Sequence, residues 1–281
     1  MNSRRLTTLS ATLLMGLCAI APTAGARTPA GSVTKSSGTV SATLSWKSGE
    51  FAVSRPRLEV SRAGVVVTDV SVADACKSCV LFTDAPGEAF TILHVDDLDA
   101  DGEPEVLFDV YSGGAHCCVT TRFFTYRPQS NSYRRARSQY WGNAGYEVED
   151  LDGDGRLELS GRDDVFAFAF SSYAASAFPP KILRYERNAG RGTSTLTDVT
   201  RRFPAVIRAD AARLLRKIRR AKAVRGLFEI QGAIAAYVGD QYLLGRGSVG
   251  KVELARARRR GLTTPGFETR LLRFLRRTGY R

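Results

Sequence analysis

A nine-residue acidic segment occurs twice in this chain, and this repeat constrains the fold more than any other feature. The first copy runs from Asp97 to Glu105 (DLDADGEPE), and the second runs from Asp150 to Glu158 (DLDGDGRLE), 53 residues further on. Each copy precedes a candidate strand, a turn of small residues and a second candidate strand. A period of this length is typical of a β-propeller blade. We therefore predict two repeated β units, at about residues 90–145 and 146–200.

The alternating acids in each copy are suited to binding calcium. Carboxylates stand at positions 1, 3, 5 and 9, glycine stands at position 6, and the main-chain carbonyl of position 7 adds a further oxygen. Calcium accepts about six to eight oxygen ligands in irregular geometry, whereas magnesium resists this much dehydration. We predict two calcium ions, one in each segment. The expected ligands are Asp97, Asp99, Asp101, Glu103 and Glu105 for the first ion, and Asp150, Asp152, Asp154, Arg156 and Glu158 for the second.

The spacing of the acids distinguishes these segments from an EF-hand. An EF-hand needs a glutamate at position 12 of its loop, where this chain has Phe108 and Gly161. With the form DxDxDGxx[DE], the segments resemble the calcium loops of the FG-GAP/VCBS family, which stand at the head of β-propeller blades. The resemblance covers roughly residues 90–190 and implies a fold and a metal rather than an activity. Closed propellers typically have at least four blades, so we expect either a two-blade fragment or a sheet arrangement with degenerate repeats.

Short candidate strands without intervening helices fill the chain from residue 40 to about residue 204. This pattern predicts an antiparallel β-rich domain, preceded by a flexible lead-in at residues 27–39, which are rich in Gly, Ser and Thr. A hairpin turn is expected at Arg62-Ala63-Gly64. The expected strands are Val40–Trp46, Leu58–Val60, Val65–Val70, Glu105–Tyr111, Thr120–Tyr126, Leu157–Leu159 and Lys181–Glu186.

After Pro204 the pattern changes to helices and the charge becomes strongly basic. Residues 201–281 hold 21 lysines and arginines against 5 acids, whereas residues 1–200 hold 20 against 23. Asp210 is expected near the start of a first helix, and three more helices are expected at Leu227–Leu244, Val252–Arg259 and Phe267–Arg277. We predict a small all-α bundle at residues 205–281. The fold class is therefore α+β, with an antiparallel, propeller-blade-like domain before the bundle.

The first 26 residues have the features of an export signal. Arg4 and Arg5 give a positive start, and an apolar stretch follows at Leu13–Ala21. Small residues then precede a cleavage site after Ala26. Because the apolar stretch is too short to anchor the chain in a bilayer, we expect a protein that is secreted or located in the periplasm or cell envelope.

Four cysteines remain after cleavage at Ala26: Cys76, Cys79, Cys117 and Cys118. An even number in an exported chain favours two disulfides, with the pairing open. A structural zinc site built from Cys76, Cys79, His116 and one or both of the adjacent cysteines is an alternative. A redox role for the CxxC motif is a further alternative, although that motif normally opens a helix after a strand.

Few residues in the mature chain suggest catalysis. Its histidines are His94 and His116, and the common nucleophile and metalloprotease motifs are absent from the sequence. We therefore predict a non-enzymatic binding or scaffolding protein, with an extracellular protein or a glycan as partner. Tyr140, Trp141 and Tyr146 form an aromatic loop that could stack on a sugar, although such residues are more often half-buried contacts of a blade. The basic C-terminal part suggests a second partner, an anionic polymer or membrane surface, and no specific nucleic acid is expected.

Overall fold

The computed structural model describes residues 30–47, 54–73, 93–114, 117–143, 145–188, 193–223 and 229–281. The predicted signal peptide lies outside these ranges, as do Cys76, Cys79 and His116. The described residues form strands up to Asp198 and α-helices from Pro204 onward. The change from strand to helix therefore occurs where the sequence becomes basic.

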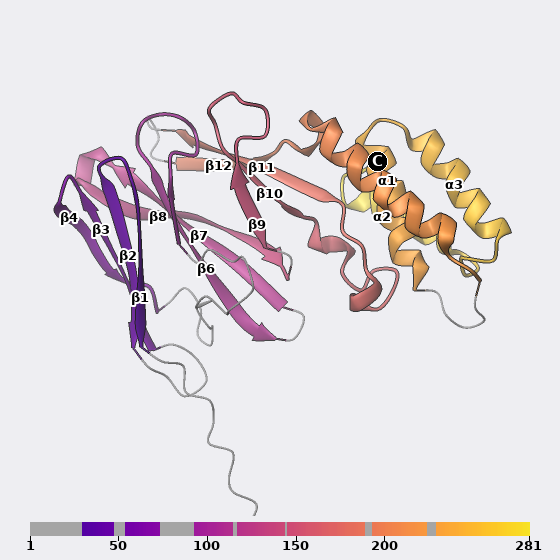
Figure 1. Ribbon diagram of the computed structural model, residues 1–281, viewed down its shortest axis with the longest axis horizontal. Coiled ribbons are helices and arrows are strands. Elements are labelled where there is room, and N and C mark those ends of the chain that lie inside the picture. Colours follow the sequence, from indigo (N-terminus) through magenta and orange to yellow (C-terminus); the bar gives the residue numbers. More distant parts are fainter. Residues whose placement is uncertain are drawn as a thin grey trace, which may run out of the picture.

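The described strands form three antiparallel sheets of four strands, each an up-and-down meander. The first sheet holds β1 (Gly31–Ser37), β2 (Val40–Lys47), β3 (Ser54–Arg62) and β4 (Val65–Ser71). The second holds β5 (Leu93–Asp96), β6 (Glu105–Gly114), β7 (Cys117–Arg127) and β8 (Ser132–Gly142). The third holds β9 (Tyr146–Glu149), β10 (Glu158–Arg162), β11 (Pro180–Asn188) and β12 (Thr193–Asp198). The sheets follow one another along the long axis of the molecule (Figure 1).

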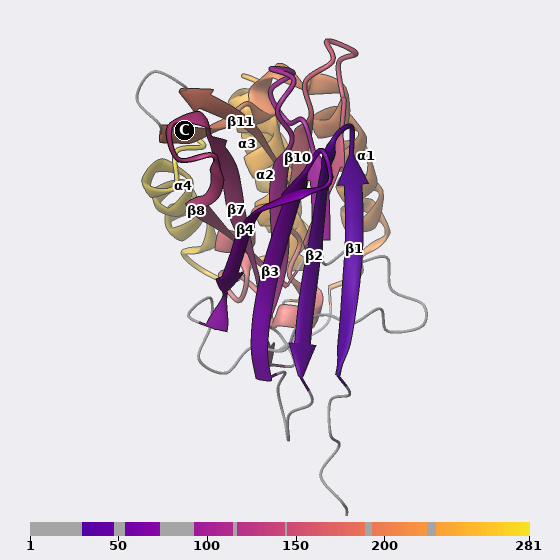
Figure 2. The ribbon, with the colours of Figure 1, turned by 90° about the vertical axis from the view of Figure 1, so that its left-hand side faces the viewer.

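The first sheet contains a strand that the sequence did not predict. Gly31–Ser37 was expected to be part of a flexible lead-in, but it pairs along its whole length with β2 as an outer strand, so that expectation is wrong. Strand pairing depends on main-chain hydrogen bonds, and hydroxyl pairs add to it here: Thr34 lies 2.8 Å from Thr43. Figure 2 shows the four strands of this sheet side by side.

Each acidic segment connects the first strand of its sheet to the second. The first segment joins β5 to β6, and the second joins β9 to β10. The strand register agrees as well, because Asp96 lies opposite Glu105 and Glu149 lies opposite Glu158. The 53-residue repeat therefore corresponds to two equivalent hairpins. The first sheet has the same strand order without an acidic segment.

Apolar residues between the sheets hold the three layers together. One core cluster joins the first two sheets, with Leu44 and Leu58 from the first and Phe108 from the second. A second cluster joins the second and third sheets through Phe123 and Tyr185, whose rings stack at 5.8 Å. Burial of this apolar surface is the main source of stability for such an arrangement.

Four helices follow the third sheet and share one apolar core. They are α1 (Pro204–Arg220), α2 (Ile230–Leu243), α3 (Gly247–Arg259) and α4 (Phe267–Arg277). Phe166 and Phe170, from the connection between β10 and β11, pack edge-on against Phe274 of α4. This connection joins the helices to the third sheet, and the helices lie at one end of the molecule (Figure 1). Among the described residues, no helix is long and apolar enough to cross a membrane.

The predicted class, α+β with antiparallel sheets before the helices, is confirmed. No closed barrel or propeller occurs within the described residues. The predicted place of Asp210 near the start of a helix is wrong. Helix α1 begins at Pro204, six residues earlier, because proline suits the first turn of a helix. Asp210 lies in the middle of α1, where its side chain is buried and pairs with Arg162 and Arg213.

Candidate functional site

The first acidic loop is held in shape by its own main chain. Asp97 accepts the N–H of Asp101 at 3.0 Å and the N–H of Gly102 at 2.8 Å. Asp101 in turn accepts the N–H of Glu103 at 3.0 Å. Gly102 has a φ of 87°, a conformation that glycine adopts without steric cost. These bonds reverse the chain tightly, so the alternating acids face a common centre.

Three carboxylates of the first loop converge as the sequence predicted. Oxygens of Asp97, Asp99 and Asp101 lie within 4.8 Å of one another. The Oδ1 atom of Asp99 is buried without a hydrogen-bond partner among the described residues. Burial raises the pKa of Asp99, and the neighbouring charge of Asp101 adds to this effect. A buried, unsatisfied carboxylate oxygen is costly unless a cation or water contacts it.

Glu105, the last residue of this acidic segment, is fully buried. It accepts the N–H of Leu98 at 3.3 Å and the hydroxyl of Thr125 at 3.2 Å. Burial raises the pKa of Glu105 to about 9, with the charge of Asp99 as the next cause. The Glu103 carboxylate instead pairs with Arg62 of the first sheet. The part of Glu103 that stays a predicted ligand is its main-chain carbonyl.

The second loop repeats this geometry closely. Asp150 accepts the N–H of Gly153 at 2.7 Å and the N–H of Gly155 at 3.0 Å. Glu158 is fully buried and accepts the N–H of Leu151 at 3.0 Å. Oxygens of Asp150, Asp152 and Glu158 lie within 4.8 Å of one another.

The remaining two predicted residues of the second loop have other contacts. Asp154 accepts the N–H of Arg156 at 3.0 Å. The Arg156 guanidinium lies 3.6 Å from Glu186, so its side chain is directed at β11. As with Glu103, the main-chain carbonyl of Arg156 stays the predicted ligand.

An arginine that the sequence patterns did not indicate lies inside the second loop. Arg184 of β11 donates to Glu158 at 2.7 Å, and it also bonds Asp154 at 2.9 Å and Asp152 at 3.2 Å. Its side chain is only 3% exposed. The register offered a signal, because Arg184 lies directly opposite Glu158 in the β10–β11 pair. That register depends on a strand pairing which the sequence alone does not fix.

A second arginine reaches the first loop from the neighbouring sheet. The main-chain N–H of Arg187 donates to Asp99 at 2.7 Å, and its Nε donates to Asp101 at 2.7 Å. The two contacts tie β11 of the third sheet to the acidic loop of the second. These residues are more than 80 positions apart in the chain, so local sequence gave no indication of the contact.

The cysteine predictions fall largely on residues whose side chains the structure does not describe. Cys118 is described, forms a disulfide, and has its sulfur 2.8 Å from the hydroxyl of Tyr140. Cys76 and Cys79 lie outside the described residues, and the Cys117 side chain is also outside them. The pairing of the predicted disulfides therefore stays a prediction.

The predicted aromatic segment is mostly internal. Trp141 is buried, stacks on Tyr146 at 4.8 Å, and donates from its indole N–H to Thr121 at 3.0 Å. Thr121 and Tyr146 both donate to buried Asp109, whose pKa burial raises to about 6. Trp141 is thus part of the core, so the interpretation of it as a sugar-stacking ring is wrong. Tyr140 is 52% exposed.

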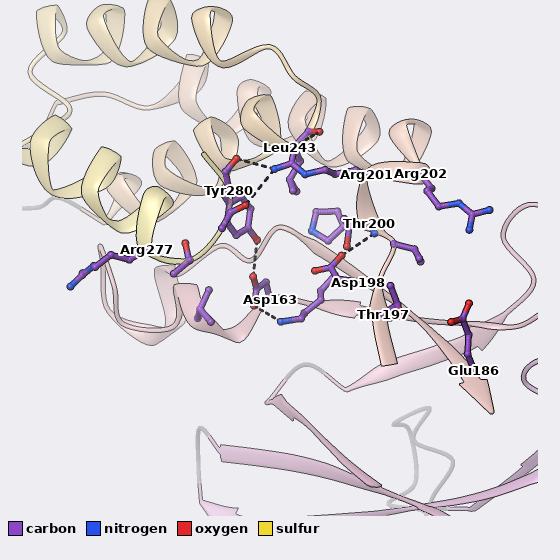
Figure 3. Close-up of a pocket in the computed structure, with 16 residues that line it drawn as sticks. Asp163, Glu186, Thr197, Asp198, Thr200, Arg201, Arg202, Leu243, Arg277 and Tyr280 are labelled. Atoms are coloured by element: carbon purple, nitrogen blue, oxygen red, sulfur yellow. Dashed lines mark hydrogen bonds and ion pairs between the residues drawn. The ribbon is translucent and has the colours of Figure 1, made fainter. Parts of the chain in front are cut away.

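A pocket of about 870 Å³ lies between the third sheet and the helices (Figure 3). Arg201 donates to the main-chain carbonyls of Tyr242 at 2.9 Å and Tyr280 at 3.0 Å, near the C-terminal ends of α2 and α4. The Tyr280 hydroxyl donates to Asp163 at 2.8 Å, and Lys181 lies 3.3 Å from the same carboxylate. These charged and polar side chains have partners in the protein, so they join the helices to the sheet.

Comparison with known proteins gives two partial relatives. No family model and no solved structure matches the chain. A probable thylakoid lumen protein of Synechocystis sp. is 30% identical over 155 residues, which is 55% of this chain and 44% of that protein. An uncharacterized protein of Sinorhizobium fredii is 27% identical over 124 residues, 44% of this chain and 18% of that protein. The chain therefore spans less than half the length of these curated relatives.

Proposed function

We propose that this is a non-catalytic calcium-binding protein that acts as a binding or scaffolding module outside the cytoplasm. The observation that carries the proposal is the buried Oδ1 atom of Asp99, which lacks a hydrogen-bond partner among the described residues. Asp97 and Asp101 place further oxygens beside it, and buried Glu105 lies at the end of the same loop. Calcium supplies the charge that such a group of oxygens needs, in the irregular geometry that it tolerates.

Two observations support the location. Residues 1–26 have the features of an export signal. One relative is named as a probable thylakoid lumen protein, a compartment outside the cytoplasm. We propose that this chain is likewise exported, to the periplasm, the cell envelope or the medium.

We also propose that each sheet is a propeller-type blade of the FG-GAP/VCBS kind. Each sheet is a four-stranded meander, and two of them carry an acidic loop between their first two strands. Calcium in such a loop would stiffen the edge of a blade and the surface that it presents to a protein or glycan partner. The helices, as a small basic bundle, would form a separate binding region.

Calorimetric titration of the full, chelator-treated chain with calcium chloride tests the proposed function. We expect calcium uptake and a higher melting temperature, because a ligand that binds only the folded state stabilises it by about 1.4 kcal/mol at tenfold excess over Kd. Asp99→Asn should abolish binding at the first loop. Asp69→Asn, which alters an exposed ion pair with Arg57 on the first sheet, is the matched control and should leave binding unchanged. A folded wild-type chain that takes up no calcium would overturn the proposal.

A second candidate function concerns the basic helices. Exposed arginines lie along α3 and α4, among them Arg258, Arg259, Arg273, Arg276 and Arg277. A dense positive surface attracts anionic polymers or membranes in a salt-dependent way. Retention on a polyanion column should fall steeply between low and physiological salt. Equal retention of a variant with Arg273, Arg276 and Arg277 changed to glutamine would contradict this second function.

A further inference from the structure

The two acidic loops differ at one equivalent position in the neighbouring strand. In the second sheet, Thr125 donates its hydroxyl to Glu105 at 3.2 Å. In the third sheet, Arg184 donates to Glu158 at 2.7 Å from the equivalent position of the neighbouring strand. The strand register supports the equivalence. Val106 pairs with Phe124, so the adjacent residues Glu105 and Thr125 lie opposite each other in the antiparallel pair. Glu158 and Arg184 lie opposite each other in the same way. A small neutral side chain therefore lies under one loop, and a permanent cation lies under the other.

Arg184 is placed to neutralise the second loop from within. Its guanidinium bonds Asp152, Asp154 and Glu158, which are three of the four carboxylates predicted to bind calcium there. The arginine stays charged at any physiological pH and donates in a fixed planar fork. Because its side chain is 3% exposed, it is packed among β10, β11 and the loop and cannot move into water without opening them.

In the first loop, a guanidinium among the described residues bonds only one of the three converging carboxylates. Arg187 reaches the loop from the next sheet and bonds Asp101 through the guanidinium. Asp99 receives a main-chain N–H of Arg187 on Oδ2, while its Oδ1 is buried and has no partner among the described residues. The hydrogen bonds to Glu105 come from neutral groups, Thr125 and the Leu98 N–H. The first loop therefore retains one buried, unsatisfied carboxylate oxygen, that of Asp99, which a metal ion would contact.

We infer that Arg184 is the built-in cation of the second loop, so that the chain binds calcium in the first loop alone. The inference rests on the proposed function, because it assigns the stoichiometry of the same metal. A guanidinium bonded to three of the carboxylates takes up the oxygens that calcium needs and repels the ion electrostatically. The second loop would then be a salt-bridged structural turn, ordered whether or not calcium is present.

Titration of the full, chelator-treated chain with calcium chloride decides between one site and two. We expect one ion per chain for the wild type, none for Asp99→Asn and still one for Asp152→Asn. Two ions for the wild type, with one lost in Asp152→Asn, would overturn the inference while supporting the proposed function. A folded wild type that binds no calcium would instead overturn the proposed function. These three proteins need no change at Arg184, so the result does not depend on how well an Arg184 variant folds.

A variant of Arg184 tests the cause of the difference. Arg184→Thr gives the second loop the residue type that Thr125 provides in the first, and we expect it to bind a second calcium ion. Arg57→Thr is the matched control, because Arg57 pairs with Asp69 on the exposed face of the first sheet, and it should bind one ion. If folded Arg184→Thr still binds one ion, Arg184 is not what excludes calcium and the inference fails.

Discussion

The main chain of Arg187 donates a hydrogen bond of 2.7 Å to Asp99, and this contact joins two sheets at the loop that we propose to bind calcium. The guanidinium of the same residue bonds Asp101. One loop of the second sheet is therefore ordered by a strand of the third. Calcium bound between Asp99 and Asp101 would stiffen this junction as well as its own hairpin.

Removing the Arg187 side chain should weaken this junction. Its side chain is 9% exposed, so Arg187→Ala leaves the Asp101 carboxylate partly buried without its cation. We expect the free energy of unfolding to fall by about 1–3 kcal/mol. Arg57→Ala removes a surface pair with Asp69 and should cost less than about 1 kcal/mol. Urea denaturation of both variants, without calcium, measures the difference, and equal losses would show that the junction adds nothing.

Position 4 of the acidic loops offers a matched pair of substitutions. Ala100 has a φ of 57°, and its counterpart Gly153 has a φ of 74°, with open space where a Cβ would lie. This left-handed conformation costs a residue with a Cβ about 1–2 kcal/mol. Ala100→Gly should therefore raise the free energy of unfolding by up to about 1 kcal/mol, and Gly153→Ala should lower it by about 1 kcal/mol or more. Thermal denaturation of both variants tests this account, and shifts of the melting temperature in the same direction would contradict it.

Local features of the chain were predictable from the sequence. The hairpin turn predicted at Arg62-Ala63-Gly64 is present between β3 and β4, with Ala63 and Gly64 both at positive φ. Helix α4 spans the residues expected for it, because its apolar residues recur on one face. The acidic loops formed where their spacing indicated, since the alternating carboxylates cap their own turns.

Features that depend on strand pairing were not predictable. Strand β8 was missed, and its residues Tyr140 and Trp141 were interpreted as part of a loop, because the arginines along it hide the strand pattern. Strand β1 was missed because an outer strand needs few apolar residues. Arg184 was missed because its relation to Glu158 exists only once β10 and β11 pair. Sequence patterns report local periodicity, whereas these features depend on which strands become neighbours.

The contact between Tyr280 and Asp163 should contribute to holding the helices on the third sheet. The hydroxyl of Tyr280 is bonded to the carboxylate at 2.8 Å in a buried setting. Tyr280→Phe removes the donor and leaves Asp163 with Lys181, at an expected cost of about 1–3 kcal/mol. Tyr126→Phe is the control, because it removes an exposed bond of the same length to Asn131 and should cost less. Thermal denaturation of both variants would contradict the assignment if Tyr126→Phe proved the more damaging.

A pair of buried carboxylates should make stability depend on pH. Asp240 of α2 is fully buried. Burial raises its pKa well above the ordinary aspartate range, and the charge of Asp210 raises it further. Asp210, unlike Asp240, is bonded by two cationic side chains, Arg162 and Arg213. Asp240 is therefore the member of the pair that holds the proton in the folded protein at neutral pH.

The sign of the pH effect follows from this raised pKa. Below the pKa of the unfolded chain both states hold the proton, and the full stability is present. As the pH rises toward the raised pKa of the folded state, only the folded protein holds the proton, so stability falls by at most about 1.4 kcal/mol per pH unit. Asp240→Asn imitates the protonated side chain and should remove this part of the slope. The free energy of unfolding of the variant, minus that of the wild type, should therefore be larger at about pH 8 than at about pH 5.

Urea denaturation at both pH values measures this difference. Glu253→Gln is the control, because Glu253 is another buried carboxylate of the helices and pairs with Arg256 at 2.5 Å. This control should lose stability while keeping the wild-type slope, since Asp240 is unchanged in it. If Asp240→Asn has the wild-type slope as well, Asp240 is charged in the folded protein and the pair does not share a proton. In that case the two carboxylates would both depend on Arg162 and Arg213 for their neutralisation, and Arg162→Gln should then be more damaging at about pH 8 than at about pH 5.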